Sequence, residues 1–188
     1  MLKHFEEYGK WVEITGFPNV AIKDPKEFSK ALGTKLCGDC EIQLFDADLV
    51  ATWEHLYFAV LNALMNIENK RGISKSLAME VMLYASAQRQ IRKALKLVGL
   101  TPASKNVAVV VICDKAELVK AGAKVTARFL GVEPDENVLA LSQLKKQRIR
   151  EVFDVSDAEL EPISTGESGD QALVDAVVER VALLSTKL

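Results

Sequence analysis

The sequence predicts a mixed α/β (α+β) domain, in which a small sheet of about three or four strands packs against helices. Two segments carry the strand prediction. Residues 106–113 are a solid β-branched run typical of a buried strand, and residues 41–45 alternate polar and apolar side chains. Around these segments apolar residues recur at helical spacing, so the few strands are separated by helical blocks.

Spacing and capping signals define the predicted elements in order. Strands are expected at 10–14, 41–45 and 106–113, and residues 138–141 form either a brief strand or the start of the next helix. Asp46 or Asp48 can cap the long helix that ends at Ile67. The helices are expected at 25–33, 49–67, 77–84, 88–98, 115–130, 142–153 and 171–184.

The length of 188 residues fits one domain with a short appendage. We expect a single α/β domain over residues 1–163, followed by a linker and a C-terminal amphipathic helix in residues 164–188. The linker prediction depends on the Pro-, Gly- and Ser-rich stretch 162–169. Apolar residues that share one face indicate the helix, namely Leu173, Val177, Val181 and Leu184.

Several classes of protein find no support in the sequence. The N-terminus is polar, and the longest strongly apolar run has seven residues, whereas a bilayer span needs roughly 20. We therefore expect a cytoplasmic protein without a membrane partner. No phosphate-binding loop and no nucleophile motif occurs, so we expect neither an enzyme nor a bound cofactor.

The three cysteines do not suggest a complete disulfide framework. Cys37 and Cys40 form a C-x-x-C, but a structural zinc needs four ligands and no second pair stands at ligand spacing, so we expect no metal. The pair is interpreted as incidental, with a regulatory disulfide as the alternative. His55 lies in the middle of a predicted helix and is interpreted as a packed or surface residue.

Charge is distributed unevenly, although the net charge is only −2. Residues 69–105 contain eight basic residues and the single acid Glu80, whereas nine acids and two basic residues lie in 151–188. A chain polarised in this way can hold a local positive field despite its acidic total. Both segments can also be ordinary solvated helix faces.

The basic segment is organised on the predicted helix at 88–98. The apolar side is expected to consist of Ile91, Ala94, Leu95 and Val98. Basic residues repeat the same spacing two positions earlier, about 200° around the helix, at Arg89, Arg92, Lys93 and Lys96. Cations that repel one another are tolerated most easily where an anion binds, although the helix dipole also favours the last two. We predict a polyanion site formed by Lys70, Arg71, Lys75, Arg89, Arg92 and Lys96.

The same region resembles a known family. The matching residues are Glu80, Leu83, Tyr84 and Ser86, then 88–91, Ala94, Leu95 and Gly99, with 43–47 upstream and Phe153, Ser156, Glu159 and Leu160 downstream. This pattern, spread over residues 41–160, is similar to the small kinase-binding regulatory subunit of the KEOPS complex, the PRPK-binding protein family in its archaeal form.

The resemblance implies a non-catalytic subunit of the machinery that makes threonylcarbamoyladenosine on tRNA. Such a subunit binds the atypical kinase/ATPase of the complex directly and the rest of the complex indirectly. Archaeal members are also implied to recruit tRNA through its single-stranded 3′ CCA end, which would be the ligand of the cations. Tyr84 is then either a stacking partner for a base or a core tyrosine. Exposed apolar positions on the helices at 48–67 and 72–84 are the expected kinase-facing surface.

Two other functions stay open at this point. The cations can meet an acidic protein, in which case the chain is a protein-interaction adaptor without RNA binding. They can also hold a small anionic substrate in an enzyme, which would require a nucleophile or a general base nearby.

Overall fold

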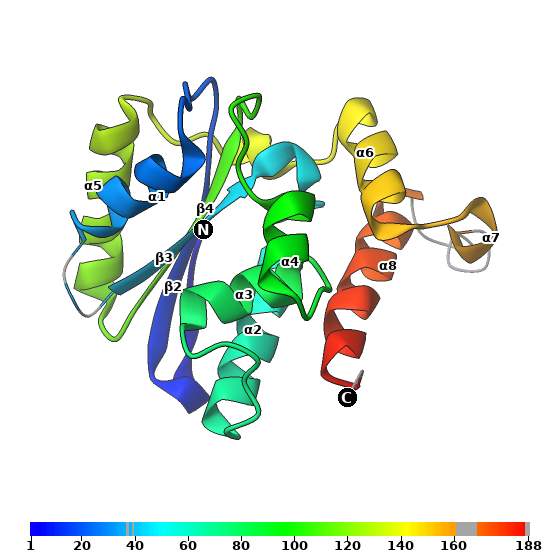
Figure 1. Ribbon diagram of the computed structural model, residues 1–188, viewed down its shortest axis with the longest axis horizontal. Coiled ribbons are helices and arrows are strands. Elements are labelled where there is room, and N and C mark those ends of the chain that lie inside the picture. The colour runs from blue at the N-terminus through cyan, green and yellow to red at the C-terminus, as the bar shows by residue number, and fades with distance from the viewer. Residues whose placement is uncertain (37, 39, 161–168, 187–188) are drawn as a thin grey trace.

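The computed structural model describes residues 1–36, 38, 40–160 and 169–186. Its centre is an antiparallel sheet in the order β1-β2-β4-β3, formed by β1 (Leu2–Phe5), β2 (Lys10–Phe17), β3 (Cys40–Asp46) and β4 (Val107–Cys113) (Figure 1). β4 pairs along its whole length with both β2 and β3. An antiparallel sheet covered by helices confirms the predicted α+β class.

The two faces of β4 belong to two separate apolar cores. Every residue of this strand is buried. Alternate side chains point to opposite faces, so Ala108, Val110 and Ile112 enter one core and Val107, Val109, Val111 and Cys113 the other. Burial on both faces explains the unbroken β-branched sequence of the strand.

The smaller core lies under α1 (Pro25–Gly33) and α5 (Ala116–Leu130). Asp24 caps α1, because its carboxylate accepts the backbone N–H groups of Lys26 and Glu27 at 2.8 and 3.1 Å. Gly131 ends α5 in the left-handed conformation (φ 67°), which a glycine adopts without steric cost.

The larger core lies on the other face, under α2 (Trp53–Glu68), α3 (Leu77–Ala85), α4 (Ile91–Val98) and α8 (Gly169–Leu183). α2 packs against both α3 and α8. Among the described helices, none is both long and apolar enough to cross a membrane.

Two further helices, α6 (Gln143–Phe153) and α7 (Asp157–Leu160), lie beside α8 at one end of the molecule (Figure 1). The backbone N–H of Ser156 donates to the carboxylate of Glu159 at 2.8 Å, as its S-x-x-E spacing predicts. Together with Arg180 of α8, which donates at 2.8 Å, this bond lowers the pKa of Glu159 to about 2. The expected boundary between residues 163 and 164 lies outside the described residues.

The observed elements differ from the sequence prediction in several places. No strand was predicted at β1, because a short edge strand depends on pairing with β2 more than on its own sequence. α2 begins only at Trp53, because Asp46 instead caps the 3-10 helix Ala47–Leu49 by accepting the N–H of Asp48 at 3.0 Å. Residues 136–139 form a 3-10 helix instead of the brief strand considered for 138–141.

A disulfide joins Cys40 of β3 to Cys113 of β4. The two residues stand directly opposite each other in the strand register, with Cα atoms 4.4 Å apart. The sequence favours an incidental Cys37/Cys40 pair, with a regulatory disulfide between them as the alternative, whereas Cys40 is bonded to Cys113 and Cys37 lies outside the described residues. Pairing across 73 residues depends on strand register, which cysteine spacing does not reveal.

Candidate nucleic-acid interface

The predicted cationic stripe lies on α4, which is shorter than its sequence suggests. The helix begins at Ile91 instead of Gln88, because Ala87 takes a left-handed conformation (φ 52°) and ends α3. Arg92 and Lys96 are one turn apart on α4, and both are exposed. Arg89 is exposed in the turn before the helix, so the prediction that it lies on the helix is wrong.

Only half of the expected apolar side of α4 is covered. Ala94 and Val98 are fully buried in the larger core, whereas Ile91 and Leu95 remain 44% and 42% exposed. On a helix the exposed pair is next to the positions of Arg92 and Lys96, because consecutive residues are about 100° apart. The outer surface of α4 therefore combines apolar and cationic side chains.

The other predicted cations lie on the connection between α2 and α3, at Lys70, Arg71 and Lys75, and all are exposed. Glu80 of α3 anchors this connection from inside the protein. Its fully buried carboxylate accepts the backbone N–H groups of Ile73 and Ser74 at 3.0 and 2.6 Å. These bonds satisfy a buried carboxylate and fix the segment that carries the cations.

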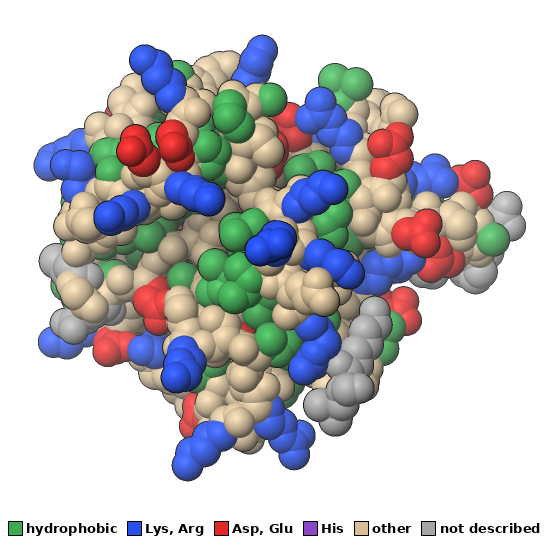
Figure 2. All heavy atoms as spheres, in the orientation of Figure 1, with side chains coloured by type: hydrophobic (Ala, Val, Ile, Leu, Met, Phe, Trp, Pro, Cys, Tyr) green, Lys and Arg blue, Asp and Glu red, His purple; other side chains and the backbone are tan. Residues whose placement is uncertain are grey.

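Across the described residues, none of the six predicted RNA-binding cations has a carboxylate within 4.0 Å. Other cations do, as Arg148 does with Asp48 at 3.0 Å. Figure 2 shows Lys and Arg side chains gathered over α4 and toward the connection between α2 and α3, with apolar side chains between them. Such a surface attracts a polyanion.

A groove of about 670 Å³ runs between α4 and the start of α1. Leu95 of α4 and Met79 of α3 line it with apolar side chains, and Gln43 lies on β3 between the helices. Lys23 and Lys26 add two exposed cations from the α1 side. In Figure 2 this part of the surface is hollowed, with Lys and Arg side chains on both sides of the hollow.

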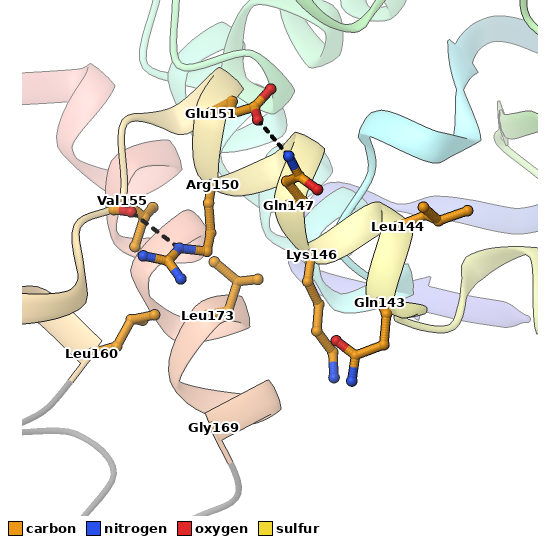
Figure 3. A pocket seen from close by; sticks show the side chains of 10 residues that line it. All are labelled: Gln143, Leu144, Lys146, Gln147, Arg150, Glu151, Val155, Leu160, Gly169 and Leu173. Atoms are coloured by element: carbon orange, nitrogen blue, oxygen red, sulfur yellow. Dashed lines mark hydrogen bonds between the residues drawn. The ribbon is translucent and has the colours of Figure 1, made fainter.

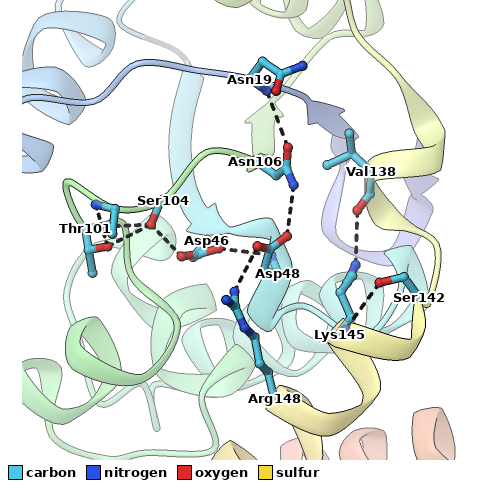
Figure 4. Close-up of polar contacts among 11 residues, drawn as sticks. Asn19, Asp46, Asp48, Thr101, Ser104, Asn106, Val138, Ser142, Lys145 and Arg148 are labelled. Carbon is cyan, nitrogen blue, oxygen red and sulfur yellow. Dashed lines mark hydrogen bonds and ion pairs between the residues drawn. The ribbon is translucent and has the colours of Figure 1, made fainter.

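Buried hydrogen bonds hold the loop that follows α4, whose Gly99, Leu100 and Pro102 also line the groove (Figure 4). Ser104 donates its hydroxyl to Asp46 at 2.5 Å and accepts the N–H of Thr101 at 3.0 Å. Burial raises the pKa of the Asp46 carboxyl, and the bond from Ser104 opposes that rise.

The same polar cluster reaches α6. Asp48 accepts the side chains of Asn106 and Arg148, each at 3.0 Å (Figure 4). Lys145 of α6 points inward and donates to the backbone oxygen of Val138 at 3.1 Å. Burial lowers the pKa of Lys145 to about 8, although the two carboxylates of the cluster oppose this shift.

Two side chains singled out in the sequence are not part of the surface. Tyr84 is buried, and burial raises its pKa to about 12. It cannot stack on a base, so the interpretation as a core tyrosine is correct. His55 is also fully buried: its Nδ1 accepts the N–H of Ala51 at 3.2 Å, which leaves Nε2 to donate to the oxygen of Ala85 at 2.7 Å. His55 is therefore a packed residue and not a surface residue, which is one of the two roles that the sequence allows.

A second hollow, of about 720 Å³, lies between α6, α7 and α8 (Figure 3). Several of its polar groups already have partners. Lys146 pairs with Asp170 at 2.5 Å, and the Gln147 amide donates to Glu151 at 3.1 Å. This hollow is therefore less suited to binding a polyanion than the groove beside α4.

Sequence reasoning missed Lys23 and Lys26. Both lie far from α4 in the chain, and the nearby acids Asp24 and Glu27 hide them in a window of mixed charge. Only the tertiary arrangement brings them to the groove. The partial exposure of Leu95 was equally hidden, because helical spacing shows which residues share a side and not how far that side is covered.

Comparisons place this chain among known proteins. A family model described as "Kinase binding protein CGI-121" matches residues 17–185. The "Regulatory protein Cgi121" of Methanocaldococcus jannaschii is 32% identical over 147 residues, which cover 78% of this chain and 85% of that protein. The matched range includes α1, β3, α3 and α4, which together line the groove.

Proposed function

This chain belongs to the CGI-121 family of kinase-binding proteins, and we propose from that premise that it is the non-catalytic regulatory subunit of a KEOPS complex. In this role it binds the kinase/ATPase subunit directly and recruits tRNA through the 3′ CCA end for threonylcarbamoyladenosine modification. The family match supports the kinase partner and the regulatory role. The sequence resemblance supports the parts of the proposal that concern the KEOPS complex and tRNA.

The main support for tRNA binding is the outer surface of α4. A single-stranded RNA end needs cations for its phosphates and apolar or aromatic surface for its bases. Arg92 and Lys96 are suited to contact the phosphates, and the exposed side chains of Ile91 and Leu95 are suited to contact the bases. Because these two cations have no carboxylate partner among the described residues, binding a phosphate breaks no ion pair there.

The groove beside α4 gives the RNA end a place to enter. Its volume lies within the range of about 300–1,000 Å³ that is usual for ligand sites. Lys23 and Lys26 extend the cationic surface across it, and Met79 and Leu95 offer apolar contact to a base. We propose that the terminal nucleotides occupy this groove while Arg89, Arg92 and Lys96 hold the phosphates that precede them.

The proposal is tested by measuring the affinity of the purified protein for intact tRNA and for the same tRNA without its CCA end, at low and at moderate salt. We expect intact tRNA to bind about tenfold more tightly or better, because the truncated form loses several charge-assisted contacts. The affinity should fall steeply with salt, by roughly 0.7 log units per log unit of salt for each single-stranded phosphate contacted. Equal affinity for both forms would contradict binding of the 3′ end.

A protein-interaction adaptor without RNA binding is the second candidate. The exposure of Ile91 and Leu95 supports it, because apolar surface of this kind is also covered by protein partners. It predicts that the isolated chain binds no tRNA and that its capture of the kinase survives nuclease treatment.

A further inference from the structure

The disulfide between Cys40 and Cys113 joins an edge strand of the sheet to the strand beside it. Cys113 lies on β4, which pairs with β2 on one side and β3 on the other, and only 1% of its surface is exposed. Cys40 is the first residue of β3, which lies at the edge of the sheet, and it is partly exposed. A thiol in solution therefore has better access to Cys40 than to Cys113.

Breaking this bond would release β3 more than β4. Cys40 and Cys113 form the terminal pair of the register between the two strands. On its other side β4 stays attached, because Cys113 stands opposite Trp11 of β2, and Lys10 forms an ion pair with Asp114. Strand ends open more easily than paired interior strands, so loss of the bond should loosen the first residues of β3.

The residue after Cys40 connects β3 to the candidate RNA site. Successive side chains of a strand point to opposite faces, so Cys40 packs against the smaller core while Glu41 is directed to the other face. There the Glu41 carboxylate accepts the hydroxyl of Ser76 at 3.0 Å and the backbone N–H of Ala78 at 2.8 Å. A carboxylate at the first turn of a helix stabilises the start of that helix, here α3.

The start of α3 in turn positions parts of the RNA site. Ser76 caps α3 by accepting the backbone N–H of Met79 at 3.3 Å, and Met79 lines the groove. Ser76 directly follows Lys75, one of the predicted RNA-binding cations. On β3 itself, Gln43 lines the same groove. Loosening of β3 at Cys40 therefore affects both the groove and the segment that carries the cation.

Resting on the proposed function, we propose that the Cys40–Cys113 disulfide is a reversible thiol-exchange site that regulates tRNA binding, with a dithiol reductant as its reaction partner. One thiolate of the dithiol attacks the sulfur of Cys40, and Cys113 leaves as a thiolate that takes up a proton. The second thiolate then attacks the reductant's own sulfur in the mixed disulfide, and Cys40 leaves and is protonated. The two cysteines gain two electrons and two protons, and the dithiol becomes a disulfide.

The oxidised chain is the form with the higher affinity for tRNA. After reduction, Glu41 and the start of α3 are held in place for a smaller fraction of the time, and the apparent affinity falls by that fraction. Glu80 still holds the backbone of Ile73 and Ser74 in the reduced chain, so binding is weakened and not abolished.

The test compares the oxidised wild-type chain with the same chain reduced by dithiothreitol. Alkylation and mass spectrometry should find Cys40 and Cys113 blocked before reduction and free after it. We expect the affinity for tRNA to fall about fivefold on reduction and to recover on reoxidation. Hydrogen exchange should become faster in residues 41–43 and 74–79, while it changes little in α8.

Three variants separate regulation from a general loss of stability. C37S keeps both bonded cysteines and should respond to dithiothreitol as the wild type does. C37S/C40S cannot form the bond, so it should bind tRNA with the lower affinity and should not respond. E41Q weakens the link from β3 to α3, so it should lower the affinity of the oxidised chain and shrink the difference between the two forms. If C37S/C40S does not fold, the reduced wild-type chain takes its place.

Three outcomes would overturn the regulatory site. They are equal tRNA affinity of the oxidised and reduced chains, unchanged exchange in residues 74–79 after reduction, and an air-oxidised chain in which Cys40 and Cys113 are not joined. A chain that binds no tRNA in either form would instead overturn the proposed function. The exchange measurement would then still decide whether the bond controls the start of α3.

Discussion

Ser104 and Asp46 lie 58 residues apart in the chain and are joined by a buried hydrogen bond of 2.5 Å. The bond ties the groove-lining loop after α4 to the segment after β3. Asp46 also accepts the N–H of Asp48, and Asp48 in turn holds Asn106 and Arg148. The position of one groove wall therefore depends on this polar cluster as well as on apolar packing.

S104A should weaken both the fold and the RNA site. It leaves the Asp46 carboxylate without its hydroxyl partner, and we expect the free energy of unfolding to fall by about 1–3 kcal/mol. The affinity for tRNA should fall severalfold because the loop loosens. S142A is the control, because it removes the cap of α6 at a cost of about 1 kcal/mol without touching the groove. If both variants lose the same tRNA affinity, the loop has no special role.

Charge reversal at Lys23 and Lys26 tests the groove itself. K23E/K26E should reduce tRNA affinity by about tenfold or more at low salt, since two phosphate contacts become repulsive. K120E/K124E makes the same change on α5, which contributes no residue to the groove, and should have a much smaller effect. Similar losses in both variants would mean that only the total charge of the protein matters.

Glu80 should act on RNA binding through the segment that it anchors. E80Q weakens the bonds to the backbone of Ile73 and Ser74, so tRNA affinity should fall together with stability. The loss of affinity should largely disappear in a chain that already lacks the cations of that segment, K70A/R71A/K75A. Double-mutant cycles of tRNA affinity measure this coupling. Additive losses would show that Glu80 affects only the stability of the fold.

Burial of His55 should make the protein sensitive to acid. Its pKa is lowered to about 4 by burial, from 6.5. Between these values the unfolded chain binds a proton that the folded chain does not, so the free energy of unfolding falls as the pH falls from 6.5 to 4, by up to about 3 kcal/mol. H55Q lacks this titration, so urea unfolding should show a flatter pH dependence. Parallel profiles for the two proteins would contradict this account.

Local signals in the sequence account for the elements that were predicted well. Asp24 before Pro25 marks the start of α1, and Gly131 marks the end of α5, because caps depend on a few neighbouring residues. The β-branched run of β4 likewise indicates a strand that is buried on both faces. These features need no knowledge of the rest of the chain.

The features that escaped prediction depend on contacts between distant segments. β1 exists because β2 pairs with it, and Cys40 meets Cys113 because β3 and β4 align in one register. Lys26 of α1 and Leu95 of α4 likewise line one groove only because the fold brings these two helices close together. The cations of α4 and of the α2–α3 connection could be found from charge and spacing, but Lys23, Lys26 and the groove that they line could not.

The central claim is that this chain brings tRNA to the kinase. The direct measurement is co-migration of labelled tRNA with the purified kinase subunit in size-exclusion chromatography, with and without this chain. We predict that tRNA migrates with the kinase only when the chain is present, and that R92E/K96E keeps the protein complex but recruits about tenfold less tRNA. If the kinase takes up tRNA equally well alone, or if R92E/K96E recruits as much as the wild type, the claim is contradicted.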